Sequence, residues 1–209
     1  MRKYILFIVI LLLSACTSST TPKPNLVKEN FTKANIDAND SKEMKDLKIS
    51  LLHYSEATMS NDIKTLVGFI YPKAFTIVPK EKMITMLTKT FNSGNVPKVK
   101  DVKHTKIETI KKYDAGIYSI ITSSMTTVIK SPRPDDKKFE EYMLTTLKKQ
   151  IASRGTVTLD KKKHLFNIQH SNKTIALNEE GSWKFVGFKQ AKKYIDKGIF
   201  PLMLIDKLN

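Results

Sequence analysis

Cys16 is the residue of this sequence whose surroundings most clearly predict a chemical modification. It is the only cysteine among 209 residues, and it follows a basic start, a continuous apolar run from Tyr4 to Leu13 and two small residues. A positively charged start, a short apolar segment and small residues before a cut are typical of a secretory signal. A membrane span would need roughly 20 apolar residues. The sequence therefore predicts an exported chain with one thiol directly after the small residues.

The block Leu13-Ser14-Ala15-Cys16 resembles the lipobox of bacterial lipoproteins. In that family the cysteine thiol receives a diacylglycerol, the chain is cut directly before the cysteine, and the new amino terminus is acylated. The resemblance implies that the mature chain starts at an acylated Cys16. Two or three acyl chains give durable anchoring, whereas one chain alone binds membranes only marginally.

The expected location follows from the anchor. We expect the protein on the cell membrane or the outer membrane, lipid-anchored and outside the cytoplasm. In the enteric version of the lipoprotein sorting rule, an aspartate after the cysteine retains the protein at the inner membrane. Here the next residue is Thr17. In a host with two membranes we therefore expect the periplasmic face of the outer membrane.

Three segments are expected along the chain. Residues 1–15 are the lipoprotein signal peptide. Residues 16–39 are the acylated cysteine and a disordered tether, because Ser, Thr, Pro and Asn bury too little apolar surface to offset the cost of ordering. Residues 40–209 have the size of one domain, and we find neither a repeat nor a second linker within them.

The chain is strongly basic, with a formal net charge of +16. One interpretation is attraction to anionic lipid head groups or to anionic envelope polymers. The other, which we favour, is a solvated lysine-rich surface, because the lysines are spread along the chain. Nucleic acid is excluded as a partner by the expected compartment.

The ionisable side chains do not form a catalytic or metal-binding pattern. An acylated Cys16 leaves no thiol for a disulfide, a metal or a nucleophile. Most acids fall where turns and helix caps need them, and the exceptions, Glu56 and Glu108, are expected on solvated faces. No nucleophile elbow, phosphate loop or dinucleotide fingerprint is present. The histidines make no His-x-His, Glu-x-x-His or His-Glu-x-x-His spacing: His53, His104, His164 and His170. We therefore expect no cofactor, no metal and no enzymatic activity.

A ligand pocket, if the domain has one, has four candidate lining residues. His164 and His170 lie six apart on one predicted strand, which places them on the same face. Aromatic residues at helical and strand spacing pack a core more often than they line a cavity. Trp183 opens an apolar strand directly after a glycine turn, so we expect it in the core. The candidate pocket residues are Tyr118, His164, His170 and Trp183.

The domain is predicted to open with three helices. Asp40 with Glu43 predicts a capping box for a first helix that ends near Met59. Ser60 and Asn61 are the predicted caps of a second helix, which Pro72 ends. Pro79 is the predicted start of a third, with Gly94 just past its end and an apolar side formed by Met83, Ile84, Leu87 and Phe91.

Strands dominate after Pro97. Residues 99–110 and 115–130 are predicted to form a hairpin around the turn Lys111-Lys112-Tyr113-Asp114. Asp135 is the predicted cap of a helix that Gly155 closes. Four further strands are predicted at 156–159, 164–170, 173–178 and 183–188, with turns that include Ser171-Asn172 and Glu179-Glu180-Gly181. A last helical turn is predicted from Pro201.

This order of elements is that of an α+β fold, in which N-terminal helices pack on a curved, mostly antiparallel sheet. It is similar to the nuclear-transport-factor-2-like superfamily, through the helical opening, the long hairpin and the ending Lys173-Thr-Ile-Ala-Leu-Asn-Glu-Glu-Gly-Ser-Trp-Lys-Phe-Val. The superfamily includes ketosteroid isomerases, polyketide cyclases and many secreted or lipid-anchored bacterial proteins. The helix after Asp135 departs from the minimal pattern, so a cystatin-like arrangement stays open.

Two hypotheses for function come from different classes. The first is a non-catalytic, lipid-anchored domain that binds an apolar small molecule or an envelope protein. The alternative is a small-molecule isomerase or lyase of the polyketide-cyclase type. The feature that separates them is an ionisable side chain buried in a cavity within hydrogen-bond reach of a second polar group. A third hypothesis, an adaptor for anionic envelope polymers, rests on charge alone.

The anchor is directly testable. Replacing Cys16 with Ser should leave an unlipidated precursor that no longer partitions into the detergent phase, because the acyl chains supply the membrane affinity. Intact mass and phase partitioning measure both effects, with Ser14→Thr as a control that keeps the thiol. A Cys16→Ser protein with unchanged mass and partitioning would rule out the anchor.

Overall fold

Two long strands form the centre of the structure. In the computed structural model, which describes residues 36–92 and 96–200, β3 (Gly116–Lys130) pairs antiparallel with β5 (Leu165–Asn178) from Ile117 opposite Asn178 to Lys130 opposite Leu165. The predicted turn Ser171-Asn172 is therefore wrong. Both residues lie inside β5, opposite Ser124 and Ser123 of β3.

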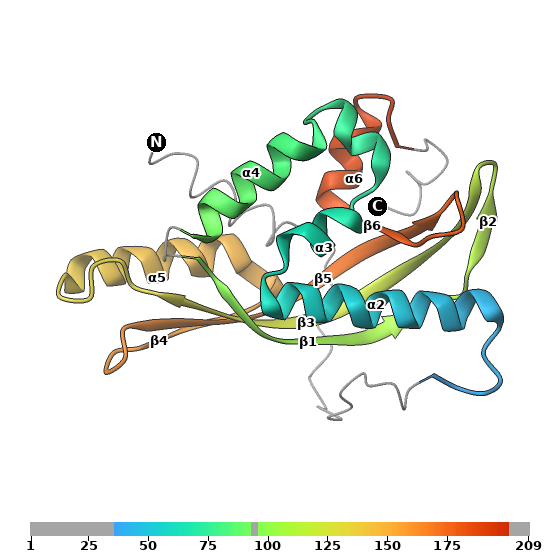
Figure 1. Ribbon diagram of the computed structural model, residues 1–209. Helices are drawn as coiled ribbons and strands as arrows, with labels where there is room; N and C mark the ends of the chain where they lie inside the picture. The colour runs from blue at the N-terminus through green and yellow to red at the C-terminus, as the bar shows by residue number, and fades with distance from the viewer. Residues whose placement is uncertain (1–35, 93–95, 201–209) are drawn as a thin grey trace.

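Shorter strands pair with the outer edges of this central pair. Strand β1 (Lys98–Ile107) and strand β2 (Lys111–Tyr113) both pair with β3, while β4 (Gly155–Asp160) and β6 (Lys184–Gly187) both pair with β5. The result is a six-stranded antiparallel sheet with helices around it, an α+β fold (Figure 1). The predicted turn Lys111-Lys112-Tyr113-Asp114 is wrong in its first three residues, which form the strand β2, while Asp114 lies in the turn between β2 and β3.

Helices cover the two faces of the sheet unequally. Alternation along β3 and β5 puts Ile121, Phe166 and Ala176 on one face, where they pack under α2 (Lys42–Ser60) and α5 (Lys137–Ile151). Ile120 and Ile175 lie on the opposite face and pack against α6 (Phe188–Ile195). Helix α6 was not predicted, since the strand expected at 183–188 ends at Gly187.

The connection between α2 and the opposite face runs past the edge of β6. Helix α3 (Ile63–Gly68) leads to Phe69, whose carbonyl accepts the Phe185 amide at 2.8 Å, and Ile70 forms a parallel bridge with Phe185. A 3-10 helix (Pro72–Thr76) and α4 (Lys80–Phe91) follow. The predicted apolar side of α4 is only half-buried, and α4 has no buried residue.

The helix caps differ from the predicted ones by one residue. Ser41, not Asp40, caps α2 by accepting the Met44 amide at 3.2 Å. Asp62 caps α3 through the Thr65 amide, while Asn61, in the left-handed region at φ 57°, ends α2. Asp136 rather than Asp135 accepts the Phe139 amide and caps α5. Gly155 belongs to β4, after a 3-10 turn (Ala152–Arg154).

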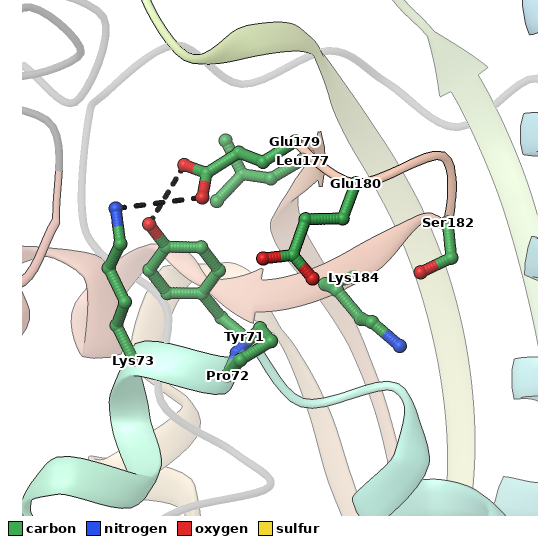
Figure 2. A pocket seen from close by; sticks show the side chains of 8 residues that line it. All are labelled: Tyr71, Pro72, Lys73, Leu177, Glu179, Glu180, Ser182 and Lys184. Atoms are coloured by element: carbon green, nitrogen blue, oxygen red, sulfur yellow. Dashed lines mark hydrogen bonds and ion pairs between the residues drawn. The ribbon is translucent and has the colours of Figure 1, made fainter.

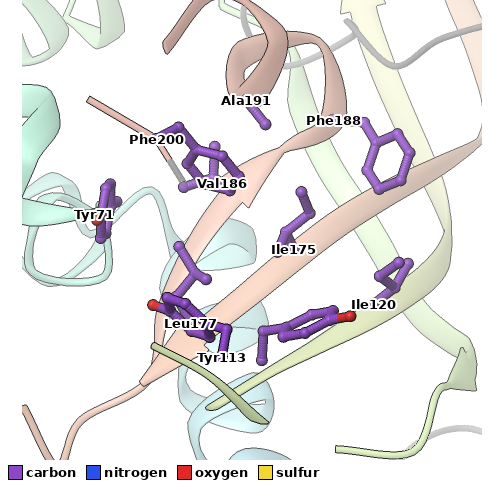
Figure 3. Close-up of a cluster of buried hydrophobic side chains, with 10 residues drawn as sticks. Tyr71, Tyr113, Ile120, Ile175, Leu177, Val186, Phe188, Ala191 and Phe200 are labelled. Carbon is purple, nitrogen blue, oxygen red and sulfur yellow. The ribbon is translucent and has the colours of Figure 1, made fainter. Parts of the chain in front are cut away.

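Within residues 36–92 and 96–200, three apolar clusters fill the interior. One, between β5 and α6, includes Tyr118, Leu177 and Phe188 (Figure 3). The others lie under α5, around Phe166, and under α2, around Leu51. Trp183 is 3% exposed in the α2 cluster, which confirms its predicted place in the core.

Several sequence predictions fall on residues outside the described ranges. They are the signal peptide at 1–15, nearly all of the tether with Cys16, Gly94 and the helical turn from Pro201. Among the residues that the structure describes, no helix has the length and apolar character needed to cross a bilayer.

The burial of Trp183 predicts a large stability effect. Trp183→Ala should lower the free energy of unfolding by about 3–5 kcal/mol, because truncating a buried aromatic side chain removes its contacts and leaves a cavity. Urea unfolding followed by circular dichroism measures this. Tyr142→Ala is the matched control, since Tyr142 is 68% exposed on α5. A Trp183→Ala variant as stable as the control would contradict the core assignment.

Candidate functional site

Glu179 is the centre of a polar cluster beside the hairpin of β5 and β6. Its Oε1 accepts the hydroxyl of Tyr71 at 2.9 Å and the hydroxyl of Tyr113 at 2.6 Å. Its Oε2 lies 3.5 Å from the Lys73 ammonium nitrogen. Figure 2 shows the Tyr71 hydroxyl and the Lys73 ammonium group directed toward the Glu179 carboxylate. The structure thus joins three distant parts of the chain through one acid.

The sheet holds Glu179 in position. Glu179 directly follows Asn178, the last residue of β5, and a Cβ at Gly116 would lie 2.2 Å from the Asn178 carbonyl oxygen. Only glycine therefore allows β3 to begin so close to this point. The turn after Glu179 contains Gly181 at φ 77°, in the region that favours glycine. The acid is fixed by backbone geometry on both sides.

The two tyrosines are held by the core rather than by loops. Tyr71 is 1% exposed and packs edge-on against Phe200, with ring centroids 5.9 Å apart. Tyr113, the last residue of β2, lies opposite Gly116 of β3 and contacts the Tyr118 ring edge-on, with 6.0 Å between the ring centroids. Both rings belong to the apolar cluster of Figure 3, and their hydroxyls reach the Glu179 carboxylate.

Burial and neighbouring charge set the protonation of this cluster. Burial raises the pKa of Tyr71, and burial together with the bond to Glu179 raises the pKa of Tyr113 far above its ordinary value. The pKa of Lys73 is also raised, chiefly by the Tyr71 phenol and further by Glu179. At neutral pH the tyrosines are therefore neutral donors and Lys73 is a cation.

A small cavity opens beside the cluster. Its volume is about 50 Å³. A site for a drug-sized ligand has roughly 300–1,000 Å³. The cavity therefore admits one small chemical group and not a whole polycyclic molecule. The residues that line it are Tyr71, Pro72, Lys73, Leu177, Glu179, Glu180, Ser182 and Lys184.

His104 forms a second polar contact, between α2 and the sheet. Its Nε2 lies 2.9 Å from the Ser55 hydroxyl of α2, and its Nδ1 lies 2.8 Å from the Ser123 hydroxyl of β3. Burial lowers the pKa of His104. Both serines are 6% exposed. This chain of hydrogen bonds joins helix to sheet, and its hydroxyls are too buried to attack a substrate.

His170 lies further along the same face of the sheet. It is 1% exposed, and its Nε2 lies 2.9 Å from Asn172 Nδ2. Burial, with a smaller contribution from the Arg154 charge, lowers the pKa of His170 to about 4. Its Nδ1 and the Asn172 Oδ1 are buried and have no partner among the described residues.

The four predicted pocket residues do not meet. Tyr118 lies on the α6 face of the sheet, whereas His170 and Trp183 lie on the opposite face. His164 is not on the predicted strand with His170. It lies in the turn before β5 at φ 54°, where its Nδ1 pairs with Glu140 at 3.1 Å.

Sequence reasoning missed the cluster around Glu179. The sequence indicates only a turn there, because Glu179 and Glu180 directly precede Gly181. Most other acids of the chain also fall where turns and helix caps are expected, so Glu179 does not stand out among them. The partners of Glu179 come from positions 108 and 66 residues away in the chain. Glu56 lies exposed as expected, while Glu108 is half-buried and pairs with Lys106.

Neither a metal site nor a known relative adds to this description. Within residues 36–92 and 96–200, no three His, Cys, Asp or Glu side chains come together in a way that could hold a metal ion. Comparisons with protein families, curated proteins and solved structures gave no match.

The lowered pKa of His170 predicts how the free energy of unfolding depends on pH. Its pKa is about 4 in the fold and about 6.5 in an unfolded chain, so between these values the unfolded chain binds more protons. The contribution of His170 is complete above pH 6.5 and is lost as the pH falls to 4. Acidification from pH 7 to 4 should cost roughly 3 kcal/mol through this residue.

Urea unfolding of wild type and His170→Leu across this pH range measures the effect. The variant should lose this part of the pH dependence, while His53→Leu, at an exposed position of α2, should keep it. Equal pH dependence in wild type and His170→Leu would show that His170 is not buried in its neutral form.

Proposed function

We propose that the chain is a lipid-anchored cell-envelope protein whose α+β domain binds a ligand or a partner and does not catalyse a reaction. The Leu13-Ser14-Ala15-Cys16 block supports the anchor. The proposed location is the cell membrane, or the periplasmic face of the outer membrane in a host with two membranes. The proposed partners beyond the membrane are an apolar small molecule, an envelope protein or an anionic envelope polymer.

The observation that carries the non-catalytic proposal is the state of Glu179. A general base needs a free lone pair within reach of the substrate's proton and a site that surrounds the substrate. One oxygen of Glu179 already accepts two hydroxyls, the other faces an ammonium group, and the cavity measures only about 50 Å³. This geometry suits recognition of a small group on a larger partner.

The second candidate, an isomerase or lyase of the polyketide-cyclase type, has one observation in its favour. Glu179 is an acid in a cavity within hydrogen-bond distance of Tyr71 and Tyr113, and acid–base enzymes use such carboxyl and phenol pairs. In a proton-transfer mechanism the phenol hydroxyls would donate hydrogen bonds to the substrate. Here both phenols donate to the acid itself, which favours the binding function.

We also propose that the fold is a variant of the nuclear-transport-factor-2-like or cystatin-like arrangement. Support comes from the helices that precede the sheet and from the closing hairpin of β5 and β6. Two elements depart from the minimal pattern, α5 between β3 and β4, and α6 on the opposite face from α2.

Complementation of a deletion strain tests the proposed function. Each of Glu56→Ala, Glu108→Ala, His164→Ala and His170→Ala should restore a near-wild-type phenotype wherever circular dichroism shows a folded protein. A folded variant of this set with a loss of function of several orders of magnitude would contradict binding and favour acid–base catalysis.

A further inference from the structure

We propose that the cavity beside Glu179 binds a primary ammonium group, and that Lys73 occupies this site in the free protein and is displaced on binding. The inference rests on the proposed binding function and names the chemical class of its ligand. It follows from the orientation of the carboxylate, the exposure of Lys73 and the aromatic wall of the cavity.

The carboxylate of Glu179 is oriented with one oxygen, Oε2, directed at the half-exposed Lys73. Two phenol hydroxyls use Oε1, at 2.9 and 2.6 Å, and fix the plane of the group. Oε2 lies 3.5 Å from Lys73 Nζ, beyond the 2.7–3.2 Å typical of an N–H···O hydrogen bond. A closer ammonium group would therefore gain a shorter charge-assisted hydrogen bond than the contact that Lys73 makes in this position.

The Lys73 side chain can be displaced from Glu179 at little cost. Its side chain is 52% exposed, whereas that of Glu179 is 18% exposed. Exposed ion pairs are weak, since solvent screens them and two side chains must be ordered. Swinging Lys73 into water therefore costs little and uncovers a carboxylate that stays in place.

The remaining walls of the cavity suit a cation. Lys73 Nζ lies 5.6 Å from the centroid of the Tyr71 ring, within the range of a cation–π contact. Glu180 is a second acid in the lining of the cavity. Lys184, the other cation of the lining, donates to the Gly68 carbonyl at 2.8 Å and is held outside this contact. Removing Lys73 thus leaves two acids facing the cavity.

The volume of the cavity limits which part of the ligand can enter it. About 50 Å³ accommodates an ammonium head with its alkyl stem directed outward to solvent. Such a head group occurs on a lysine side chain of a partner protein and on a free alkylamine. The two sources share this chemistry, and they differ in whether flanking peptide contacts add affinity.

Nuclear magnetic resonance on the full-length chain in lipid nanodiscs tests the proposal. The probes are butylammonium chloride and the peptide acetyl-Gly-Lys-Gly-amide, at ionic strength held constant with tetramethylammonium chloride, which has no N–H donor. We expect saturable, millimolar shifts of the Glu179 to Ser182 amides in wild type. A tighter response to the peptide would assign the site to a partner protein, and an equal or weaker one to a free amine.

Variants separate the roles of the cavity residues. Lys73→Ala should bind butylammonium about fivefold more tightly. The substitution removes the Lys73 ammonium, which competes for the Glu179 carboxylate with the free energy of an exposed ion pair. Glu179→Gln, which keeps an oxygen to accept both phenols, should abolish saturable binding. Lys184→Ala should bind as wild type does.

Three results would overturn the inference. They are no saturable shift in wild type, an equal response to tetramethylammonium alone, or undiminished binding in Glu179→Gln. None of them bears on the anchor, which is judged by the partitioning of Cys16→Ser, so failure of this site and failure of the membrane location are distinguishable.

Discussion

The pairing of β3 with β5 is the constraint on which the other elements depend. It joins residues 117–130 to residues 165–178 in one continuous antiparallel register, and each of the four shorter strands pairs with one of these two. Because side chains alternate between faces, a slip of one residue would exchange the α2 and α6 faces. The register therefore decides which helix covers which cluster of the core.

The same register places the candidate site. Strand β5 ends at Asn178, against the start of β3, so Glu179 emerges at a fixed point of the sheet edge. Tyr113 reaches it from β2, and Tyr71 reaches it after the chain has passed the edge of β6. The acid is thus held by elements that are themselves held by the sheet. Such a rigid carboxylate loses little freedom when a ligand binds, which is the advantage of a preorganised site.

Local sequence patterns predicted the elements of this fold better than their ends or their contacts. Helical periodicity located α2 and α5, but neighbouring Asp40 and Ser41 are both competent caps, and spacing alone does not choose between them. Ser171-Asn172 is typical of a turn, yet its pairing with β3 keeps it in a strand, because tertiary contacts override weak local preference. The partners of Glu179 lie too far away in the chain for any local pattern to show them.

The central claim is that Tyr113 and Tyr71 orient Glu179, so that the site exists before a ligand arrives. A double-mutant cycle on Tyr113→Phe and Glu179→Leu, by urea unfolding, measures this orientation most directly. We expect a coupling free energy of about 1–2 kcal/mol, because either substitution alone already removes the hydrogen bond between the Tyr113 hydroxyl and the Glu179 carboxylate. Additivity of the two variants within about 0.3 kcal/mol would mean that the hydroxyl and the carboxylate do not interact, so that Tyr113 does not orient Glu179.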